Sequence, residues 1–209
     1  SAAEAIAGGW HGDPFAVLGP HKVAKGWEVV AFVPGADRLW LLTGKTEAEA
    51  EAYPGVAGLF THQMARKANY RFRAQGHGTT WEFDDPYRFG PVLGEMDEYL
   101  LGEGTHRRLW QALGAHVMNH EGVDGVHFAV WAPNAERVSV VGDFNVWDGR
   151  RHAMRRRGAT GVWEIFVPGL TEGTAYKYEI KGPGGAVMPL KADPVGFGSE
   201  HPPANASVV

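Results

Sequence analysis

The sequence predicts an all-β protein made of two tandem immunoglobulin-like β-sandwiches joined by a short helical linker. Three observations lead to this fold class. The 209 residues include 29 glycines and 13 prolines, which favours frequent turns over long helices. Short runs of β-favouring residues lie between those turns, as in sandwich domains. The order of these runs occurs twice, about one hundred residues apart, which is the size of a small sandwich.

The repeat is visible at a constant offset along the chain. Residues 26–42 align with residues 125–141, which places VPGADRLWLL opposite APNAERVSVV. Both copies then continue with an aromatic-basic-aromatic strand and an Asp-Pro pair: Tyr70-Arg71-Phe72 and Asp85-Pro86 in the first, Tyr176-Lys177-Tyr178 and Asp193-Pro194 in the second. A repeat of this length indicates two copies of one domain.

The two copies and the segment between them divide the chain into three parts. Residues 1–92 are the expected N-terminal β-sandwich domain, 93–113 a linker with a short helix, and 114–209 a second β-sandwich. Apolar Met96, Leu100 and Leu101 follow helical spacing and predict the linker helix. At the start of the chain, SAAEAIA predicts another short helix, with Ser1 and Glu4 spaced as a capping box.

Composition and charge exclude several function classes. A net charge of −4 and an isoelectric point near 6.2 disfavour nucleic acid as a partner. The chain has no cysteine, so neither a disulfide framework nor a thiolate metal site is expected, and a cytoplasmic location fits this. No apolar run approaches the ~18 residues that span a membrane, so no membrane partner is expected.

The sequence does not support a helical metal site at its closely spaced histidines. His116 and His120 are four residues apart, as on a metal-binding helix. Gly114, Gly122 and Gly125 argue against a helix there, and no third ligand has suitable spacing. We therefore expect neither a metal nor another cofactor.

One loop in the second copy suits recognition of a sugar. The run VSVVGDFNVW, residues 138–147, predicts a strand that ends at Gly142, followed by a loop that presents Asn145 and Trp147. The apolar face of a pyranose stacks on an indole, while its hydroxyls need amide or carboxylate partners. The alternative is that Trp147 caps the end of the sandwich core. The first copy has Thr43-Gly44-Lys45-Thr46 at this place and no such loop.

Over both copies, the chain resembles the amino-terminal part of bacterial glycogen (1,4-α-glucan) branching enzymes. The strings DPFAVLGPH and DDPYRFGPVLGEMDEYLLGEGTH resemble the first domain of that family. The strings FAVWAPNAERVSVVGDFNVWDGRRHAMRRRGATGVWEIFVPG and YKYEI resemble its family-48 carbohydrate-binding module. The resemblance implies a modular family-13 enzyme in which a catalytic (β/α)8 barrel follows the second sandwich. It implies an α-glucan partner (glycogen or maltooligosaccharides), contact with that barrel, and no catalytic residue in this chain.

The resemblance also implies site residues. Related glycogen-binding modules, such as that of the AMP-activated kinase β subunit, grip sugar with two Trp and a Lys. Trp147 matches the first Trp and Lys177 matches the Lys, so Trp147, Asn145 and Lys177 form the predicted sugar-binding set. The second Trp would fall within 182–187, where no aromatic residue occurs.

Other prominent residues have structural interpretations. Asp143, Asp148 and Glu164 are interpreted as turn-fixing acids rather than a hydrolytic pair. Alternating strands predict that four tryptophans are core residues: Trp27, Trp40, Trp131 and Trp163. A cluster of arginines after the loop predicts a solvated basic face or a barrel-docking face: Arg150, Arg151, Arg155, Arg156 and Arg157.

Two alternative functions stay open at this point. The chain could be a structural spacer that sets transferred chain length or assembly without holding sugar. It could also belong to a related family-13 debranching or trehalose-forming hydrolase, although the tandem first copy argues against that.

Overall fold

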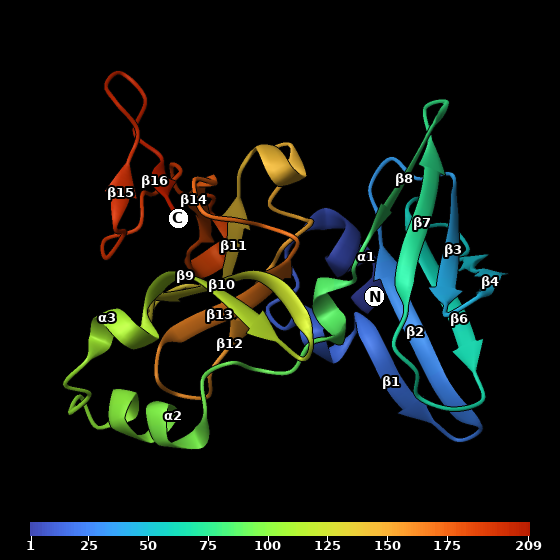
Figure 1. Cartoon of the computed structure of the whole chain (residues 1–209), viewed down its shortest axis with the longest axis horizontal. Coiled ribbons are helices and arrows are strands. Elements are labelled where there is room, and N and C mark those ends of the chain that lie inside the picture. The colour runs from blue at the N-terminus through green and yellow to red at the C-terminus, as the bar shows by residue number, and fades with distance from the viewer. The chain divides into compact units, whose positions relative to one another are not determined.

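The computed structural model describes residues 1–209 and divides them into two compact units, Ser1–Arg88 and Phe89–Val209. Each unit contains two four-stranded antiparallel sheets, and the chain has few helices (Figure 1). The predicted fold class, all-β with two sandwiches joined by a short helical segment, is confirmed. None of the helices combines the length and the apolar character needed to cross a membrane.

The first unit begins with helix α1 (Ala2–Gly8), and its predicted capping box is confirmed. The Glu4 backbone N–H donates to Ser1 Oγ, while the Glu4 carboxylate accepts from the terminal ammonium at 2.7 Å. These contacts satisfy donors that a helix N-terminus leaves without intrahelical partners. Gly9 ends the helix with φ 71°, a left-handed conformation that glycine adopts without strain.

Two sheets make up the rest of this unit, with strand orders β1-β2-β6-β5 and β4-β3-β7-β8. The first sheet contains β1 (Gly19–Val23), β2 (Gly26–Phe32), β5 (Glu51–Ala52) and β6 (Leu59–Met64). The second contains β3 (Arg38–Thr43), β4 (Thr46–Glu49), β7 (Arg71–Gly76) and β8 (Thr79–Phe83).

Side-chain alternation along β3 decides which residues enter the core. Leu39 and Leu41 are fully buried among residues of both sheets, together with Phe72 on β7. Trp40 lies between the two leucines, so it projects from the opposite face. There it is half-buried, and the Arg38 guanidinium lies 4.6 Å from its ring centroid. The prediction that Trp40 is a core residue is therefore wrong, and Trp27, on β2, is likewise only half-buried.

The second unit repeats this arrangement, with strand orders β12-β13-β10-β9 and β11-β14-β16-β15. The first of these sheets contains β9 (Gly114–His120), β10 (Val123–Trp131), β12 (Arg155–Arg156) and β13 (Val162–Pro168). The second contains β11 (Arg137–Val141), β14 (Ala175–Lys181), β15 (Gly198–Ser199) and β16 (Ser207–Val208).

The two tryptophans on the strands β10 and β13 lie on opposite faces of their sheet. Trp163 on β13 is buried and pairs in register with Val130, which confirms the core prediction for this residue. Trp131 ends β10 on the face opposite Phe128 and Val130, and it is 61% exposed. The prediction that Trp131 is a core residue is therefore wrong, because the strand's alternation turns this position away from the core.

Each unit contains its own hydrogen bond between a tyrosine hydroxyl and a buried aspartate, which we call the tyrosine–aspartate lock. Tyr70 donates its hydroxyl proton to Asp85 at 2.6 Å, and Tyr176 donates to Asp193 at 2.8 Å. The other carboxylate oxygen of each aspartate accepts a backbone N–H two residues later, from Tyr87 and Val195 respectively. In both copies the lock therefore joins the region of one strand, β7 or β14, to the Asp-Pro segment that follows it in the chain.

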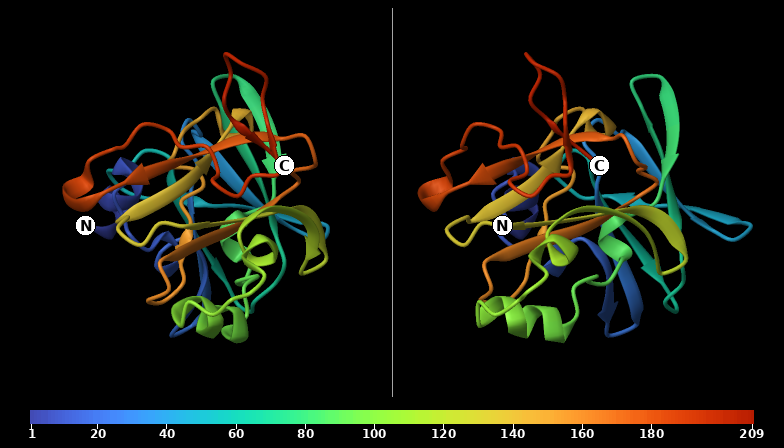
Figure 2. Two further views of the ribbon diagram at one scale, coloured as in Figure 1. Left: turned by 90° about the vertical axis from the view of Figure 1, so that its left-hand side faces the viewer. Right: turned by 60° about the vertical axis from the view of Figure 1, so that its left-hand side comes forward.

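A strap, residues 89–113, covers the outer face of the sheet that contains β10 and β13. It includes the predicted linker helix, α2 (Glu95–Gly102), and a second short helix, α3 (Leu109–Ala112). Leu93 is buried against Ala129 and Val162 of that sheet. In both views of Figure 2, helix α2 lies at the foot of the second unit.

Charged side chains of the sheet fix the strap through its backbone. Glu164 accepts the Leu93 N–H at 3.0 Å, Arg157 donates to the Leu93 carbonyl at 3.2 Å, and Arg155 donates to the Phe89 carbonyl at 3.0 Å. A backbone segment held in this way has its polar groups satisfied while it excludes water from the sheet beneath it. The strap is therefore part of the second unit.

Candidate functional site

The candidate site is the loop that follows β11 in the second unit. Strand β11 ends at Val141, Gly142 is extended, and the 3-10 helix η3 (Asp143–Asn145) turns the chain. Val146 and Trp147 then adopt left-handed backbone conformations, with φ 51° and 59°. Non-glycine residues rarely adopt this region, and a β-branched valine there is a genuine outlier. Figure 1 shows this gold loop at the end of β11.

The loop holds Trp147 at the surface in a defined orientation. Its side chain is 37% exposed, and its indole N–H donates to Asp143 Oδ1 at 2.8 Å. Its backbone N–H donates to the Gly142 carbonyl at 2.9 Å. Because the polar edge of the indole is already satisfied, the exposed part of the ring offers an apolar surface.

Asn145 builds the loop from within. It is 2% exposed, and its Oδ1 accepts the Gly142 N–H at 3.0 Å. Its Nδ2 donates to the Val140 carbonyl at 2.9 Å and to His152 Nδ1 at 3.0 Å. Donors and acceptor are all engaged by the protein, so a direct contact between this amide and a sugar would require the loop to open.

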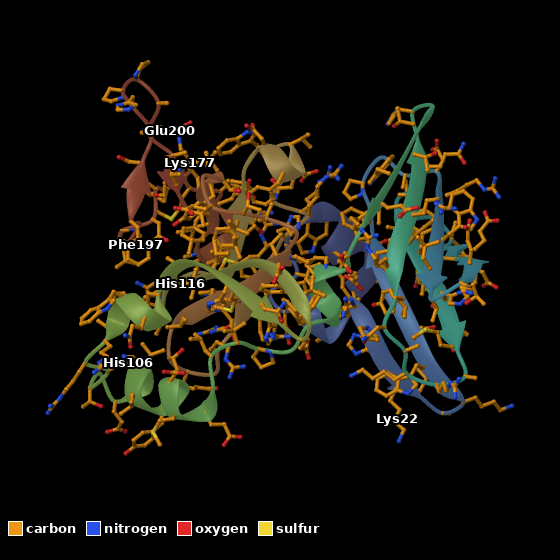
Figure 3. All side chains as sticks on the ribbon, viewed as in Figure 1. Lys22, His106, His116, Lys177, Phe197 and Glu200 are labelled. Carbon is orange, nitrogen blue, oxygen red and sulfur yellow. The ribbon has the colours of Figure 1, made fainter.

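Lys177 lies at the base of the same loop. It is on β14, in register with Val141 of β11, and its neighbours Tyr176 and Tyr178 point into the core. The Lys177 side chain therefore projects from the outer face of this sheet. Figure 3 shows it beside the C-terminal segment, where its ammonium contacts the side-chain oxygen of Asn205.

The structure thus places Trp147 and Lys177 at the same end of the β11–β14 pair, while Asn145 is buried within the loop. Segment 182–187, where a second tryptophan was expected by resemblance, supplies no aromatic side chain. The segment 182–187 contains the short 3-10 helix η4 (Pro183–Gly185), and its largest side chain, that of Val187, is exposed.

The acids near the loop have structural partners. Asp143 holds the Trp147 indole, and Asp148 accepts the Arg150 backbone N–H at 3.0 Å, as expected for a turn-fixing acid. Glu164 lies on strand β13 and not in a turn, so that part of the interpretation is wrong. It is 1% exposed, and His127 Nε2 donates to it at 2.7 Å. Burial raises its pKa, but hydrogen bonds from His127 and Leu93 and the Arg157 charge together hold this pKa below its usual value.

The arginine cluster is divided between the loop and the strap. Arg150 and Arg151 form ion pairs with Asp148. Arg155 and Arg157 bind backbone carbonyls of the strap, and Arg157 also pairs with Glu98 on α2. These internal partners, rather than solvent alone, explain the basic run in the sequence.

His116 and His120 lie on strand β9, as their flanking glycines suggested, and not on a helix. His116 Nε2 hydrogen-bonds to the Leu113 carbonyl at 2.9 Å, and its ring packs edge-on against Phe197 with centroids 5.5 Å apart (Figure 3). His120 Nε2 hydrogen-bonds to the Gly90 carbonyl at 2.9 Å. Both histidines therefore have structural roles in the strap region.

Sequence reasoning missed His152, which touches two loop residues. Its Nδ1 accepts from Asn145, and its ring packs edge-on against Phe144 with centroids 5.5 Å apart. Burial, with a smaller contribution from the Arg151 charge, lowers the pKa of His152 to about 4. A histidine after a run of arginines carries no sequence signal for this role.

The fold and this loop define the class: a tandem β-sandwich chain whose second copy exposes Trp147 in the loop after β11, where the first copy has a two-residue turn between β3 and β4. The chain belongs to the amino-terminal region of the bacterial 1,4-alpha-glucan branching enzyme family. Residues 1–87 match the family described as alpha-1,4-glucan branching enzyme GlgB, N-terminal domain. Residues 112–196 match carbohydrate-binding module 48, also described as the isoamylase N-terminal domain.

Full-length relatives show the same relationship. The chain is 59% identical to the 1,4-alpha-glucan branching enzyme GlgB of Roseobacter denitrificans, over 99% of this chain and 29% of that protein. It is 56% identical to the GlgB of Mesorhizobium japonicum (98% of this chain, 28% of that protein) and 54% to that of Pseudomonas aeruginosa (95% and 28%). The chain therefore spans less than a third of the length of these relatives.

Solved structures are more distant. A pullulanase from Anoxybacillus sp. LM18-11 complexed with maltotetraose shares 15% identity with a TM-score of 0.39, covering 87% of this chain and 25% of the pullulanase. The predicted resemblance to branching enzymes is confirmed by the family and full-length matches alone. The match of residues 1–87 sets aside the debranching and trehalose-forming alternatives.

Proposed function

We propose that this chain is the glucan-positioning amino-terminal part of a cytoplasmic 1,4-α-glucan branching enzyme. In this proposal the second unit holds an α-glucan chain at the loop after β11. The catalytic segment of the longer protein transfers an α-1,4-glucan segment to a 6-hydroxyl and so forms α-1,6 branches. The observation that carries the proposal is the strained, pinned and exposed Trp147.

The geometry of Trp147 supports a stacking role. Two consecutive left-handed residues, Val146 and Trp147, are an arrangement that persists only where surrounding contacts impose it, and such residues concentrate at functional sites. The indole N–H is held by Asp143, so the ring direction is set before a ligand arrives. A pre-oriented aromatic surface reduces the ordering entropy that binding would otherwise cost.

Lys177 is the proposed polar partner of the stacked sugar. It is paired with Val141 at the base of the loop, and its ammonium, which already contacts Asn205, has further N–H donors for sugar hydroxyls. Asn145 acts by shaping the loop, since its amide is engaged within it. One aromatic platform instead of two supports a modest affinity.

Catalysis is assigned to the longer protein and not to this chain. Branching requires two carboxyl groups on opposite sides of a glycosidic bond. Here Asp143, Asp148 and Glu164 each have internal partners, and Glu164 is buried. The purified chain is expected to form no new α-1,6 linkages in amylose, and linkage analysis by NMR would reveal them if it did.

A second candidate function is a spacer that sets chain length or assembly without holding sugar. It is favoured by the absence of an aromatic residue in 182–187 and by the engagement of Lys177 with Asn205. The two candidates differ in whether the chain is retained by glucan.

The test compares two exposed tryptophans of the same unit. Trp147→Ala is expected to weaken binding to glycogen and maltoheptaose by roughly 2 kcal/mol, as for an aromatic anchor, without loss of folding. The matched control is Trp131→Ala, because Trp131 is more exposed but lies outside the loop. Affinity gels and calorimetry measure the difference. Equal retention of wild type and Trp147→Ala would reject the binding role and favour the spacer.

A further inference from the structure

His152 is half-buried and lies beside the loop, where its side chain contacts two loop residues. Its backbone carbonyl accepts the Val140 N–H at 3.1 Å, which fixes residue 152 beside strand β11. Its imidazole then meets the two side chains that shape the 3-10 turn, Phe144 and Asn145. The other face of Phe144 is directed to the core, where it stacks with Phe128 at 6.5 Å between ring centroids.

The hydrogen bonds of Asn145 require one protonation state of His152. The Asn145 carbonyl oxygen must accept from Gly142, so the amide orientation is fixed and both remaining partners must be acceptors. One of them is the Val140 carbonyl, and the other is His152 Nδ1. His152 Nδ1 therefore carries a lone pair, which fits a pKa lowered to about 4 by burial.

These contacts lead directly to Trp147. Asn145 and Trp147 both hydrogen-bond to the backbone of Gly142. The Gly142 N–H donates to the Asn145 side-chain oxygen, and the Gly142 carbonyl accepts the Trp147 backbone N–H. The left-handed conformations of Val146 and Trp147 begin immediately after Asn145. Without His152, one Asn145 donor loses its acceptor and Phe144 loses its edge contact, so the turn that imposes this conformation is weakened.

We infer that His152 is a positioning residue: acting through Asn145, it fixes the orientation of Trp147 and thereby sets the affinity of the second unit for α-glucan. This inference rests on the proposed function, because it deepens the glucan role of the same loop. It assigns no direct sugar contact to His152. The affinity of this loop then depends on a residue that the ligand does not touch.

Two substitutions separate the hydrogen bond from simple packing. His152→Leu keeps an apolar side chain of similar bulk but removes the acceptor, and we expect the maltoheptaose affinity to fall about threefold to tenfold, the effect of one lost hydrogen bond. His152→Asn can place an amide oxygen near the position of Nδ1, and we expect it to restore most of the affinity. A matched control is His116→Leu, which removes a histidine-to-carbonyl hydrogen bond elsewhere in the unit and should leave affinity unchanged.

A readout without ligand tests the same inference. The Trp147 indole N–H signal, assigned by its disappearance in Trp147→Phe, reports the hydrogen bond to Asp143. In tryptophan-labelled protein this signal should shift or broaden in His152→Leu, remain in place in His116→Leu, and recover in His152→Asn. Melting curves on all variants show whether the unit stays folded, and the Asn variant answers the question if the Leu variant does not fold.

The outcomes distinguish this inference from the proposed function. If Trp147→Ala binds glucan as wild type does, the glucan role of the loop is rejected. If Trp147→Ala loses binding while a folded His152→Leu keeps both the affinity and the indole signal, the positioning role of His152 is overturned. A His152→Asn variant that stays as weak as His152→Leu would also overturn it, since the acceptor would then not matter.

Discussion

Both units contain the tyrosine–aspartate lock, but their chains differ after the equivalent strands β3 and β11. Each joins a tyrosine hydroxyl to a buried aspartate, and the sheets β1-β2-β6-β5 and β12-β13-β10-β9 have equivalent strand orders. After β3 the first unit continues through a two-residue turn into β4, whereas after β11 the second unit makes a 3-10 turn and exposes Trp147. The difference teaches that both copies contain the stabilising contacts, while the loop that exposes Trp147 is particular to the second copy.

The outer faces of the sheets differ as well. In the first unit, strands β3, β4, β7 and β8 carry cross-strand ion pairs at the surface, such as Arg38 with Glu49 and Arg73 with Glu47 and Glu82. In the second unit the strap covers the sheet with β10 and β13, and the charged groups beneath it are buried. We therefore expect substitutions in these surface ion pairs of the first unit to have small effects, and substitutions of the buried charges under the strap to have large ones.

The largest expected effect comes from the core of the first unit. Phe72→Ala should lower its free energy of unfolding by about 3–5 kcal/mol, because the fully buried ring leaves a cavity between the sheets. Hydrogen-exchange mass spectrometry on the intact chain can follow β3 and β7 separately from β10 and β13. Faster exchange in both units to the same extent would show that the two copies do not unfold independently.

Removal of the buried carboxylate under the strap should have a similar but smaller effect in the second unit. Glu164→Ala leaves His127, the Leu93 N–H and Arg157 without this partner, and we expect a loss of about 3 kcal/mol. Urea unfolding measures it, and Arg38→Ala in the first unit is the exposed-pair control, expected to change stability far less because solvent screens this pair. Equal effects of the two substitutions would contradict the contrast between the faces.

Trp40→Ala tests the corrected position of that residue. Because Trp40 is half-buried on an outer face beside Arg38, the substitution should lower stability by about 1–2 kcal/mol, less than a core tryptophan. It should leave glucan affinity unchanged in a paired melt and titration. A loss as large as that of Phe72→Ala would show that Trp40 belongs to the core after all.

The smallest expected effect is a pH dependence with opposite signs in the two units. Burial raises the pKa of Asp85 from 3.8 to about 6, so the folded first unit holds a proton that the unfolded chain has already lost. The bound proton stabilises the folded first unit; this contribution to the free energy of unfolding is present in full below pH 3.8 and is lost as the pH rises through about 6. Acidification from pH 7 to 5 should therefore stabilise the first unit by roughly 1 kcal/mol through Asp85.

Glu164 has the opposite linkage, since its pKa is lowered from 4.5. Its contribution is present above pH 4.5 and is lost as the pH falls through the lower pKa of the folded state. Unfolding measured between pH 3 and 7 separates the two, with Asp85→Asn as the control that should flatten the response of the first unit. A first unit that weakens between pH 7 and 5 because of Asp85 would reverse the assigned sign.

Much of the fold could be read from the sequence because the repeat preserves local patterns. The Tyr-x-Tyr or Tyr-x-Phe strand and the Asp-Pro pair follow in the same order in both copies, and the structure shows that the tyrosine and the aspartate are hydrogen-bonded to each other. The sequence does not place Trp131 and Trp40 correctly, because the size of an aromatic residue favours the core while the strand's alternation decides which face it occupies. At both positions the flanking residues, Val130 in one strand and Leu39 and Leu41 in the other, occupy the inward face.

The candidate site was predictable only in part. The loop position of Trp147 and the outward position of Lys177 between two tyrosines follow from local strings, but the burial of Asn145 depends on the path of residues 148–152 back along β11. Likewise Glu164 meets His127 across paired strands and Leu93 across the strap, at separations of 37 and 71 residues. Periodicity and spacing carry no information about such contacts.

The strap has a consequence for how such a domain can be transplanted or trimmed. A recombinant segment that began at Gly114 would retain every strand of the second sandwich, yet it would bring Glu164 to an open surface without the Leu93 N–H and would uncover Ala129 and Val162. A graft that keeps Phe89 and the residues after it would carry its own cover. The smallest portable piece with the Trp147 loop is therefore longer than its β-strands, and its natural seam lies between Arg88 and Phe89.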